Sequence, residues 1–333
     1  MTISSLGLSL LILTMNLCIY SIAGSIIGAK LDNSQIKLSA KNAAYSTFFT
    51  TLISSMCLVY AFVTNDFSIK YVFNHSNLSM DPAYTWVAMY AGNEGSLLYI
   101  ALVISLSILL VLLFKPKDMI ESEPHLVAIM SGFLLFFISV MVFFANPFDT
   151  FQTNIPSDGR GMNPLLAHPG MFSHPPLLMA GLATISVPFS LITSMILTGT
   201  FRNNGLDFVR TTSLIVWCIL GVGLLLGSWW AYTILGWGGY WVWDPIENVG
   251  LMPWLVMTAF IHSIIVQRRR GMFRVWNVIL IFLAFVLAQF GMFINRGGPV
   301  VSVHSFAAST LGYIFLGFMV FSALFCTLIF IAN

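Results

Sequence analysis

Charged residues are scarce in this chain. Of its 333 residues only 8% are Asp, Glu, Lys or Arg, whereas 58% are hydrophobic and the mean hydropathy is +0.90. Such a composition excludes a soluble globular domain and indicates a chain that crosses a membrane many times. The formal net charge of +2 gives no basis for a nucleic-acid partner, and we expect none.

Cysteine is also sparse, and several cofactor motifs are missing. The four cysteines, Cys18, Cys57, Cys218 and Cys326, lie in apolar runs and form neither a CxxC nor a CxxCH motif. This pattern excludes a thiol oxidoreductase and a c-type cytochrome. The chain also lacks a Walker A string and the glycine fingerprint of a dinucleotide site, which excludes ATP hydrolysis and nicotinamide binding.

What the chain does contain is a series of apolar runs long enough to cross a bilayer. The sequence predicts an all-α polytopic membrane protein with about nine spans, forming a single membrane domain over residues 1–333. The first span has no basic segment before it and is too long for a signal sequence, so we expect it to be retained. The predicted spans are residues 5–27, 44–64, 95–114, 125–145, 177–199, 210–228, 251–267, 274–294 and 306–331.

The basic residues predict the orientation of these spans. If loop 28–43 lies on the inner (cytoplasmic or matrix) side, eleven of the fourteen basic residues fall on that side. They are Lys30, Lys37, Lys41, Lys115, Lys117, Arg202, Arg210, Arg268, Arg269, Arg270 and Arg274, against Lys70, Arg160 and Arg296 on the other. The positive-inside rule then places the N-terminus outside and the C-terminus inside. The long polar or aromatic loops also fall outside: residues 65–94, 146–176, 229–250 and 295–305.

One segment concentrates the tryptophans. Residues 227–254 read GSWWAYTILGWGGYWVWDPIENVGLMPW and hold six of the nine tryptophans of the chain. Membrane anchoring, the alternative interpretation, would scatter aromatic residues over two membrane surfaces rather than gather them in one glycine-broken stretch. The segment therefore predicts a flat aromatic platform, which suits a large planar ligand.

This segment resembles the WWD signature of the heme-handling proteins of cytochrome c biogenesis, here assigned to residues 229–254. The strings WGGYWVWDPIENVGLMPWL (237–255) and TAFIHS (258–263) are similar to the CcmF heme lyase branch rather than to CcsA or CcmC. CcmF proteins are considerably longer than this chain, so the resemblance implies the N-terminal part of a split lyase. Further CcmF-like strings follow in CcmF order: residues 61–77, 92–98, 163–166, 168–178, 187–190 and 295–307.

Two histidines predicted at the outer surface flank the Trp-rich segment. His174 precedes Pro175 and Pro176, which pre-set the first turn of a helix, and His304 follows the NRGG turn. Heme iron takes two axial ligands from opposite sides, and neutral imidazoles suit it. The match to the HPP and SVH motifs of the family implies that both ligate the heme b to be attached. For an isolated interfacial histidine, a hydrogen bond to a loop carbonyl is the alternative.

His262 differs because it lies about eleven residues into a span, roughly 16 Å along a helix. An ionisable side chain at that depth is costly unless it faces a partner or a cofactor. The resemblance implies that His262 ligates a second, membrane-embedded heme b, whose other ligand belongs to the C-terminal part of CcmF. We expect a companion chain to supply it, and His125 is a weaker substitute.

The resemblance and the loop positions give further site candidates. The outer arginines Arg160 and Arg296 suit heme propionates, because a guanidinium binds a carboxylate through two hydrogen bonds. Asp244 adjoins the heme-handling segment, and for Asp244 and Glu247 we favour a role in capping turns. Structural or solvated roles are expected for His75 and His168. The aromatic platform itself would be formed by Trp229, Trp230, Trp237, Trp241 and Trp243.

The implied function is part of a heme lyase. It would receive heme from a carrier chaperone, hold it over the platform and present its vinyl groups to the CxxCH thiols of apocytochrome c. The alternative is a CcmF-derived structural subunit of a larger complex, such as a respiratory one, with lyase chemistry weakened or lost. A heme transporter is disfavoured because the candidate ligands gather at one face. The expected location, in contact with membrane lipid, is a mitochondrial inner or bacterial cytoplasmic membrane.

Overall fold

The computed structural model describes residues 2–234, 236, 238–297, 300, 302 and 310–332, and this part of the chain is almost entirely helical. Its β structure is an isolated antiparallel bridge between Ile69 and Thr150. The predicted all-α class is therefore confirmed. The elements in chain order are α1 (Ile3–Lys30), α2 (Ser34–Val63), α3 (Lys70–His75), α4 (Pro82–Thr85), η1 (Val87–Tyr90), α5 (Asn93–Phe114), η2 (Lys117–Met119), α6 (Glu123–Phe143), η3 (Pro164–Leu166), η4 (Pro169–Phe172), α7 (His174–Thr184), α8 (Ser186–Thr198), α9 (Asn203–Ile234), α10 (Pro245–Arg270), α11 (Arg274–Asn295) and α12 (Leu311–Ala332).

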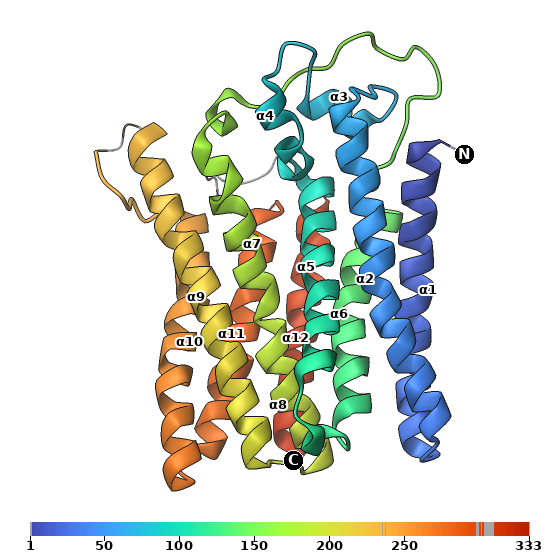
Figure 1. Cartoon of the computed structure of the whole chain (residues 1–333). Helices are drawn as coiled ribbons and strands as arrows, with labels where there is room; N and C mark the ends of the chain where they lie inside the picture. The colour runs from blue at the N-terminus through green and yellow to red at the C-terminus, as the bar shows by residue number, and fades with distance from the viewer. Residues whose placement is uncertain are drawn as a thin grey trace. The chain divides into compact units, whose positions relative to one another are not determined.

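Within the described residues, nine helical segments are long and apolar enough to cross a membrane (Figure 1). They correspond one to one with the predicted spans, which confirms a polytopic membrane protein. Several helices extend beyond the apolar runs. The helix α2 begins well before residue 44, because the Asn33 side chain accepts the N–H groups of Gln35 and Ile36 and so caps its start.

The fifth span is broken into two helices. The sequence predicted one continuous span over residues 177–199, whereas the chain leaves α7 after Thr184 and begins α8 at Ser186. Pro188 explains the break, because it has no N–H to donate to the carbonyl of Thr184 and its ring conflicts with that carbonyl.

Packing divides the chain into two compact units. The first comprises Met1–Leu109 with Met130–Phe172, and the second Leu110–Ile129 with Ser173–Asn333, so the divisions fall within α5, within α6 and between η4 and α7. A single membrane domain over residues 1–333 stays a prediction, since a packing unit is not by itself an independently folding domain.

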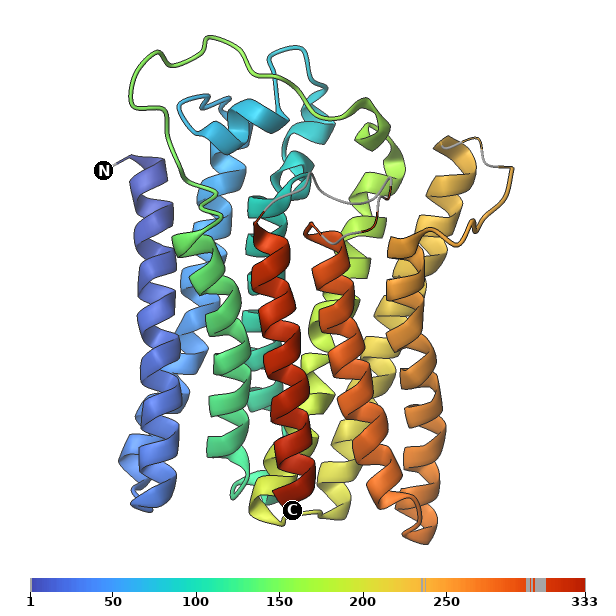
Figure 2. The same cartoon turned by 180° about the vertical axis from the view of Figure 1, so that it is seen from behind.

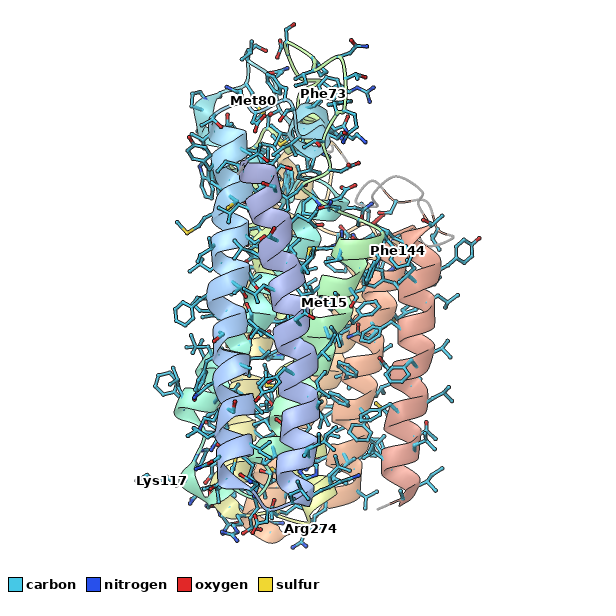
Figure 3. The ribbon with its side chains drawn as sticks, turned by 90° about the vertical axis from the view of Figure 1, so that its right-hand side faces the viewer. Met15, Phe73, Met80, Lys117, Phe144 and Arg274 are labelled. Carbon is cyan, nitrogen blue, oxygen red and sulfur yellow. The ribbon has the colours of Figure 1, made fainter. Side chains whose placement is uncertain are left out.

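In the first unit, α1 and α2 form a close antiparallel pair, seen side by side in Figure 3. A Cβ at Gly24 would lie 3.0 Å from the Cβ of Ala40, so the glycine permits the close approach. The Thr14 and Thr50 hydroxyls lie 2.7 Å apart, and Ser21 Oγ donates to the carbonyl of Ala40 at 2.7 Å. Small residues and interhelical hydrogen bonds are the usual means by which membrane helices associate.

The connections after α2 and α6 form a cap on the first unit, made of residues 64–92 and 144–172. Figure 3 shows Phe73 and Met80 in this cap. Tyr71 Oη donates to the carbonyl of Met89 and accepts the N–H of Gly92, each at 2.9 Å. The Arg160 N–H donates to the carbonyl of Phe73 at 2.7 Å, which joins the two connections.

In the second unit, α7 packs against α9, α9 against α10, and α10 against α11, which in turn contacts α12 (Figure 2). Phe189 of α8 stacks on Phe285 of α11 with ring centroids 3.9 Å apart. Because α9, α10 and α11 alternate in direction, the Trp-rich connection lies at one end of this unit. The α10–α11 turn lies at the other end.

Candidate functional site

His174 is the first residue of α7 and is almost buried, with 8% of its surface exposed. Pro175 and Pro176 occupy the first turn as the sequence predicted. The ring Nδ1 lies 2.8 Å from the carbonyl oxygen of Gly223. Because a carbonyl can only accept, Nδ1 carries the proton, and the neutral ring holds its lone pair on Nε2. Such a bond orients a histidine for metal ligation.

Glycines of α9 make room for this imidazole. A Cβ at Gly227 would overlap Cε1 of His174, and one at Gly223 would lie 2.8 Å from the backbone nitrogen of Leu178. On the facing helix, a Cβ at Gly181 would lie 2.6 Å from the Cα of Leu220. The backbones of α7 and α9 therefore touch, and this contact places the His174 ring against α9.

A pocket opens beside His174. Its cavity volume is about 20 Å³, enough for about one water molecule and far below the usual volume of a small-molecule site. The indole Nε1 of Trp241 is buried and has no hydrogen-bond partner among the described residues. A buried donor of this kind is suited to an acceptor on a bound molecule. The pocket is lined by His174, Leu178, Leu224, Gly227, Ser228, Trp241, Ile246 and Glu247.

The Trp-rich segment is largely helical at its two ends. Trp229 and Trp230 lie in the last turns of α9, and α10 begins at Pro245, so the connecting loop is shorter than the predicted 229–250. Trp230 meets the His174 ring edge to face, with centroids 5.6 Å apart. Trp243 is 71% exposed. Trp237 lies outside the described residues.

Four aromatic rings of the Trp-rich loop and the end of α9 form two pairs. Trp241 and Trp243 meet edge to face at 86°, with centroids 6.3 Å apart. Tyr232 and Tyr240 stack at 14°, with centroids 4.4 Å apart. Whether a bound ligand draws these rings into one flat platform stays a prediction.

Asp244 and Glu247 cap α10. The Asp244 side chain accepts the N–H of Glu247, and Glu247 Oε2 accepts the N–H of Asp244 at 3.2 Å, which together make a capping box; Asp244 Oδ1 also accepts the N–H of Ile246 at 3.1 Å. Asp244 Oδ1 also accepts the hydroxyl of Ser302 at 2.7 Å. Asp244 therefore connects the Trp-rich loop to Ser302, and this link was not predicted. His304 itself lies outside the described residues.

His262 lies on the exposed face of α10. Its Nδ1 donates to the carbonyl of Thr258 at 2.7 Å, so the neutral ring again holds its lone pair on Nε2. The Thr258 hydroxyl accepts the indole N–H of Trp217 at 2.7 Å, and Trp217 stacks on Trp254 at 5.2 Å. Whether His262 ligates a membrane-embedded heme stays a prediction.

The two candidate arginines have different surroundings. Arg160, in the first unit, is exposed and lies over the Phe73 ring with its guanidinium carbon 5.3 Å from the centroid. Arg296, at the end of α11 in the second unit, is 1% exposed. A fully buried arginine in this turn was not evident from the sequence, and a role in binding propionates stays a prediction for both.

The remaining histidines differ in which nitrogen carries the proton. In His168, Nδ1 accepts the N–H of Gly170 at 3.0 Å, so the neutral ring carries its proton on Nε2. In His75, Nδ1 donates to the carbonyl of Tyr71 at 2.9 Å, but a Cβ at Gly92 would overlap Nε2. Nε2 of His75 therefore abuts the backbone. The Nδ1 of His125 is buried without a hydrogen-bond partner among the described residues.

The fold defines a polytopic membrane protein in which His174 lines a small pocket, and comparisons with known proteins give its family. The family model described as cytochrome C assembly protein matches residues 90–300, which include His174, the Trp-rich segment and His262. The chain belongs to this family.

The relatives of the chain are bacterial proteins of cytochrome c biogenesis. It is 39% identical to CcmF of Haemophilus influenzae over 298 residues, which covers 88% of this chain and 45% of that protein. It is 37% identical to CcmF of Escherichia coli over 320 residues, covering 95% and 49% respectively. A solved structure of the cytochrome c heme lyase CcmF matches 99% of this chain and 51% of its own, with 30% identity and a TM-score of 0.84.

These comparisons confirm the predicted resemblance to CcmF. The chain spans about half the length of the curated relatives it matches. Together with nine apolar helices among the described residues, the bacterial relatives place it as a multi-pass protein of an energy-transducing inner membrane, such as the bacterial cytoplasmic membrane.

Proposed function

We propose that this chain is one part of a split heme lyase for cytochrome c maturation. It holds heme b at the outer membrane face, between His174 and His304 and against the Trp-rich segment, for attachment to the CxxCH thiols of apocytochrome c. One observation carries the proposal: His174, with its proton fixed on Nδ1, lines a pocket beside the unpartnered indole N–H of Trp241.

The chemistry of the side chains around this small cavity suits heme as a substrate. A neutral imidazole with its lone pair on Nε2 is an iron ligand, and its Nδ1 bond to Gly223 fixes the plane of the ring. The Trp241 N–H is a donor suited to a propionate oxygen, and the Arg296 guanidinium, which does not line the pocket, is a further candidate donor. In the attachment step a sulfur–carbon bond forms at each vinyl group and the thiol proton moves to the other vinyl carbon, so no oxidant is consumed. The protein supplies ligation and orientation.

The site lies on the outer side in this proposal. In the second unit, the arginines of the start of α9, the end of α10 and the start of α11 lie at the end opposite the Trp-rich loop, as the positive-inside rule requires. Cysteine labelling from each side of the membrane checks this orientation. Labelling of residue 240 from the inner side would remove the proposed site from the face where apocytochrome c is matured.

Substitution of the two ligands tests the function itself. His174→Ala or His304→Ala, expressed with the remaining maturation proteins, is expected to abolish holocytochrome c formation while the protein stays inserted and abundant. His75→Ala is the matched control, because the Nε2 of His75 abuts Gly92. Normal holocytochrome in both ligand variants would overturn the lyase proposal and favour a structural subunit.

His262 extends the proposal to a companion chain. Its exposed position on α10 and its Nδ1 bond to Thr258 suit one axial ligand of a heme iron, with the other axial ligand supplied by another polypeptide. In this proposal the companion carries the part of CcmF that the chain does not match in its relatives. That companion supplies the second ligand of a membrane-embedded heme b.

Optical spectra test this second site. The chain alone is expected to show no low-spin b-type spectrum, and co-expression with the companion restores one. His262→Ala should then remove it. A stoichiometric low-spin spectrum from the chain alone would contradict the need for a companion, without bearing on the outer site.

A further inference from the structure

The turn between α10 and α11 is an exposed basic segment at the end of the second unit opposite the Trp-rich loop. Every residue from Arg268 to Trp276 is exposed. The turn joins two membrane-spanning helices, Pro245–Arg270 and Arg274–Asn295, so it lies at the boundary of the bilayer. Figure 3 labels Arg274 and Lys117, and both lie at this end of the second unit.

Three of the four arginines in this turn have no carboxylate partner among the described residues. Arg268 binds Asp207 of α9 through two hydrogen bonds, Nε to Oδ1 at 2.9 Å and Nη2 to Oδ2 at 3.1 Å. Arg269, Arg270 and Arg274 form no ion pair within the described part of the chain. The turn therefore carries a concentrated positive charge that the described residues do not neutralise.

The turn is held in a fixed shape. Gly271 and Phe273 both have left-handed backbone, with φ of 69° and 64°, which a residue such as Phe adopts when its surroundings hold it there. Beneath the turn, Asn277 Nδ2 donates to Gln267 Oε1 at 2.6 Å, and both side chains are buried. Arg274 Nη2 lies 3.6 Å from where a Cβ of Gly271 would be, so this guanidinium folds back over the turn.

Large apolar side chains alternate with these arginines. Met272, Phe273, Val275 and Trp276 are 50%, 50%, 62% and 51% exposed. Such residues are unfavourable in water, but Trp and Phe beside arginine are typical of the zone where lipid headgroups meet the hydrocarbon core. The positive-inside rule requires charge alone and requires neither this fixed turn nor these aromatic residues.

We propose that the α10–α11 turn is a binding site for the headgroups of anionic phospholipids. Arg269, Arg270 and Arg274 bind phosphate oxygens, for which a guanidinium offers paired donors. Phe273 and Trp276 insert at the level of the acyl-chain boundary. The inference does not depend on the proposed lyase function, because none of these residues belongs to the pocket beside His174.

Native mass spectrometry of the purified protein tests the site. The protein is mixed with equal amounts of phosphatidylglycerol and phosphatidylcholine, and the retained lipids are counted. The wild-type protein is expected to retain more phosphatidylglycerol than phosphatidylcholine. The triple variant Arg269→Gln, Arg270→Gln, Arg274→Gln is expected to lose this preference, which should fall by about fivefold for each charge removed. Replacing the same three residues by Lys should restore most of the preference while weakening it at each paired contact.

A second variant with the same charge change is the matched control. Lys30→Gln, Lys37→Gln, Lys41→Gln removes three cations from the α1–α2 connection and its flanks and should leave most of the phosphatidylglycerol preference intact. Equal losses in both triple variants would mean that net charge alone attracts the lipid, and would overturn a site at this turn. An unchanged preference in the arginine variant, or displacement of wild-type lipid by an acidic peptide, would overturn it as well.

Discussion

His174 and His75 occupy nearly the same local arrangement in two different units. Each imidazole donates its Nδ1 proton to a backbone carbonyl, of Gly223 and Tyr71 respectively. Each lies against an aromatic ring and against a glycine whose Cβ would overlap it. The difference lies in what the ring faces. His75 presses Nε2 against the backbone of Gly92, whereas His174 lines a pocket.

This difference shows that an oriented imidazole is not sufficient evidence for a metal ligand. A carbonyl partner sets the tautomer of any buried neutral histidine, so it occurs in structural and in ligating residues alike. The distinguishing feature is that His174 lines a pocket whose other lining residues include a buried donor without an acceptor among the described residues. In this chain that donor is the indole of Trp241.

Substitution of Gly227 and of Gly92 by alanine is expected to give the largest effect in this comparison. In Gly227→Ala the new methyl group overlaps His174, and overpacking of this kind costs about 1–3 kcal/mol. The displaced ring loses its bond to Gly223, so we expect heme retention to fall about five- to hundredfold. The measurement is a pyridine hemochrome assay of the purified protein.

Gly92→Ala is the matched control, because it overpacks His75 in the first unit in the same way. It is expected to lower thermal stability and leave heme retention unchanged. If both variants lose heme equally, the His174 pocket has no special role.

Removing only the Trp241 donor sharpens the comparison. Trp241→Phe keeps an aromatic ring in the pocket but deletes the buried N–H, and a single hydrogen bond contributes about 0.5–1.5 kcal/mol. Heme retention should fall about two- to tenfold. Trp243→Phe, at a residue that is 71% exposed and outside the pocket, should have no effect. Equal behaviour of the two variants would show that the indole N–H has no ligand.

The spans could be predicted from the sequence because apolar length is a local property. The start of α7 at His174 could be predicted as well, since Pro175 and Pro176 suit the first turn of a helix. The C-terminal end of α9 could not be predicted, because hydropathy falls at Trp229 and Trp230 while the backbone continues as a helix to Ile234.

The site could be predicted only in part. The motifs pointed to His174 and the Trp-rich segment, which the structure brings together around one pocket. The glycine contact between α7 and α9 and the bond from Ser302 to Asp244 depend on residues distant in the sequence. One usable signal was present: Gly223 and Gly227 are four residues apart, a spacing typical of closely packed membrane helices.

The pH dependence of the cap distinguishes His75 in a further way. Burial lowers the pKa of His75, and the Tyr71 carbonyl and the Glu94 charge offset this only in part. An opened cap restores the ordinary pKa of about 6.5 and therefore binds protons more readily. Stability of the cap is thus full above that pH and falls as the pH drops toward the lowered pKa.

Hydrogen exchange of residues 64–92 measures this effect, after correction for the pH dependence of intrinsic exchange. Protection should decrease between about pH 7.5 and pH 5.5, and His75→Gln should make it nearly independent of pH. A wild-type cap whose protection does not change would contradict the burial of this imidazole.

The smallest effect is expected at Glu247, which lines the pocket beside His174. Its Oε2 accepts the N–H groups of Asp244 and Val242, so its role is to cap α10. A glutamine can accept the same bonds in a capping box, so Glu247→Gln should change stability by less than about 0.5 kcal/mol and leave cytochrome maturation intact. Glu247→Ala deletes the cap and should cost about 1 kcal/mol, measured as a lower melting temperature. If Glu247→Gln instead keeps the melting temperature but stops maturation, the carboxylate takes part in the chemistry, and the site needs a charge as well as an imidazole.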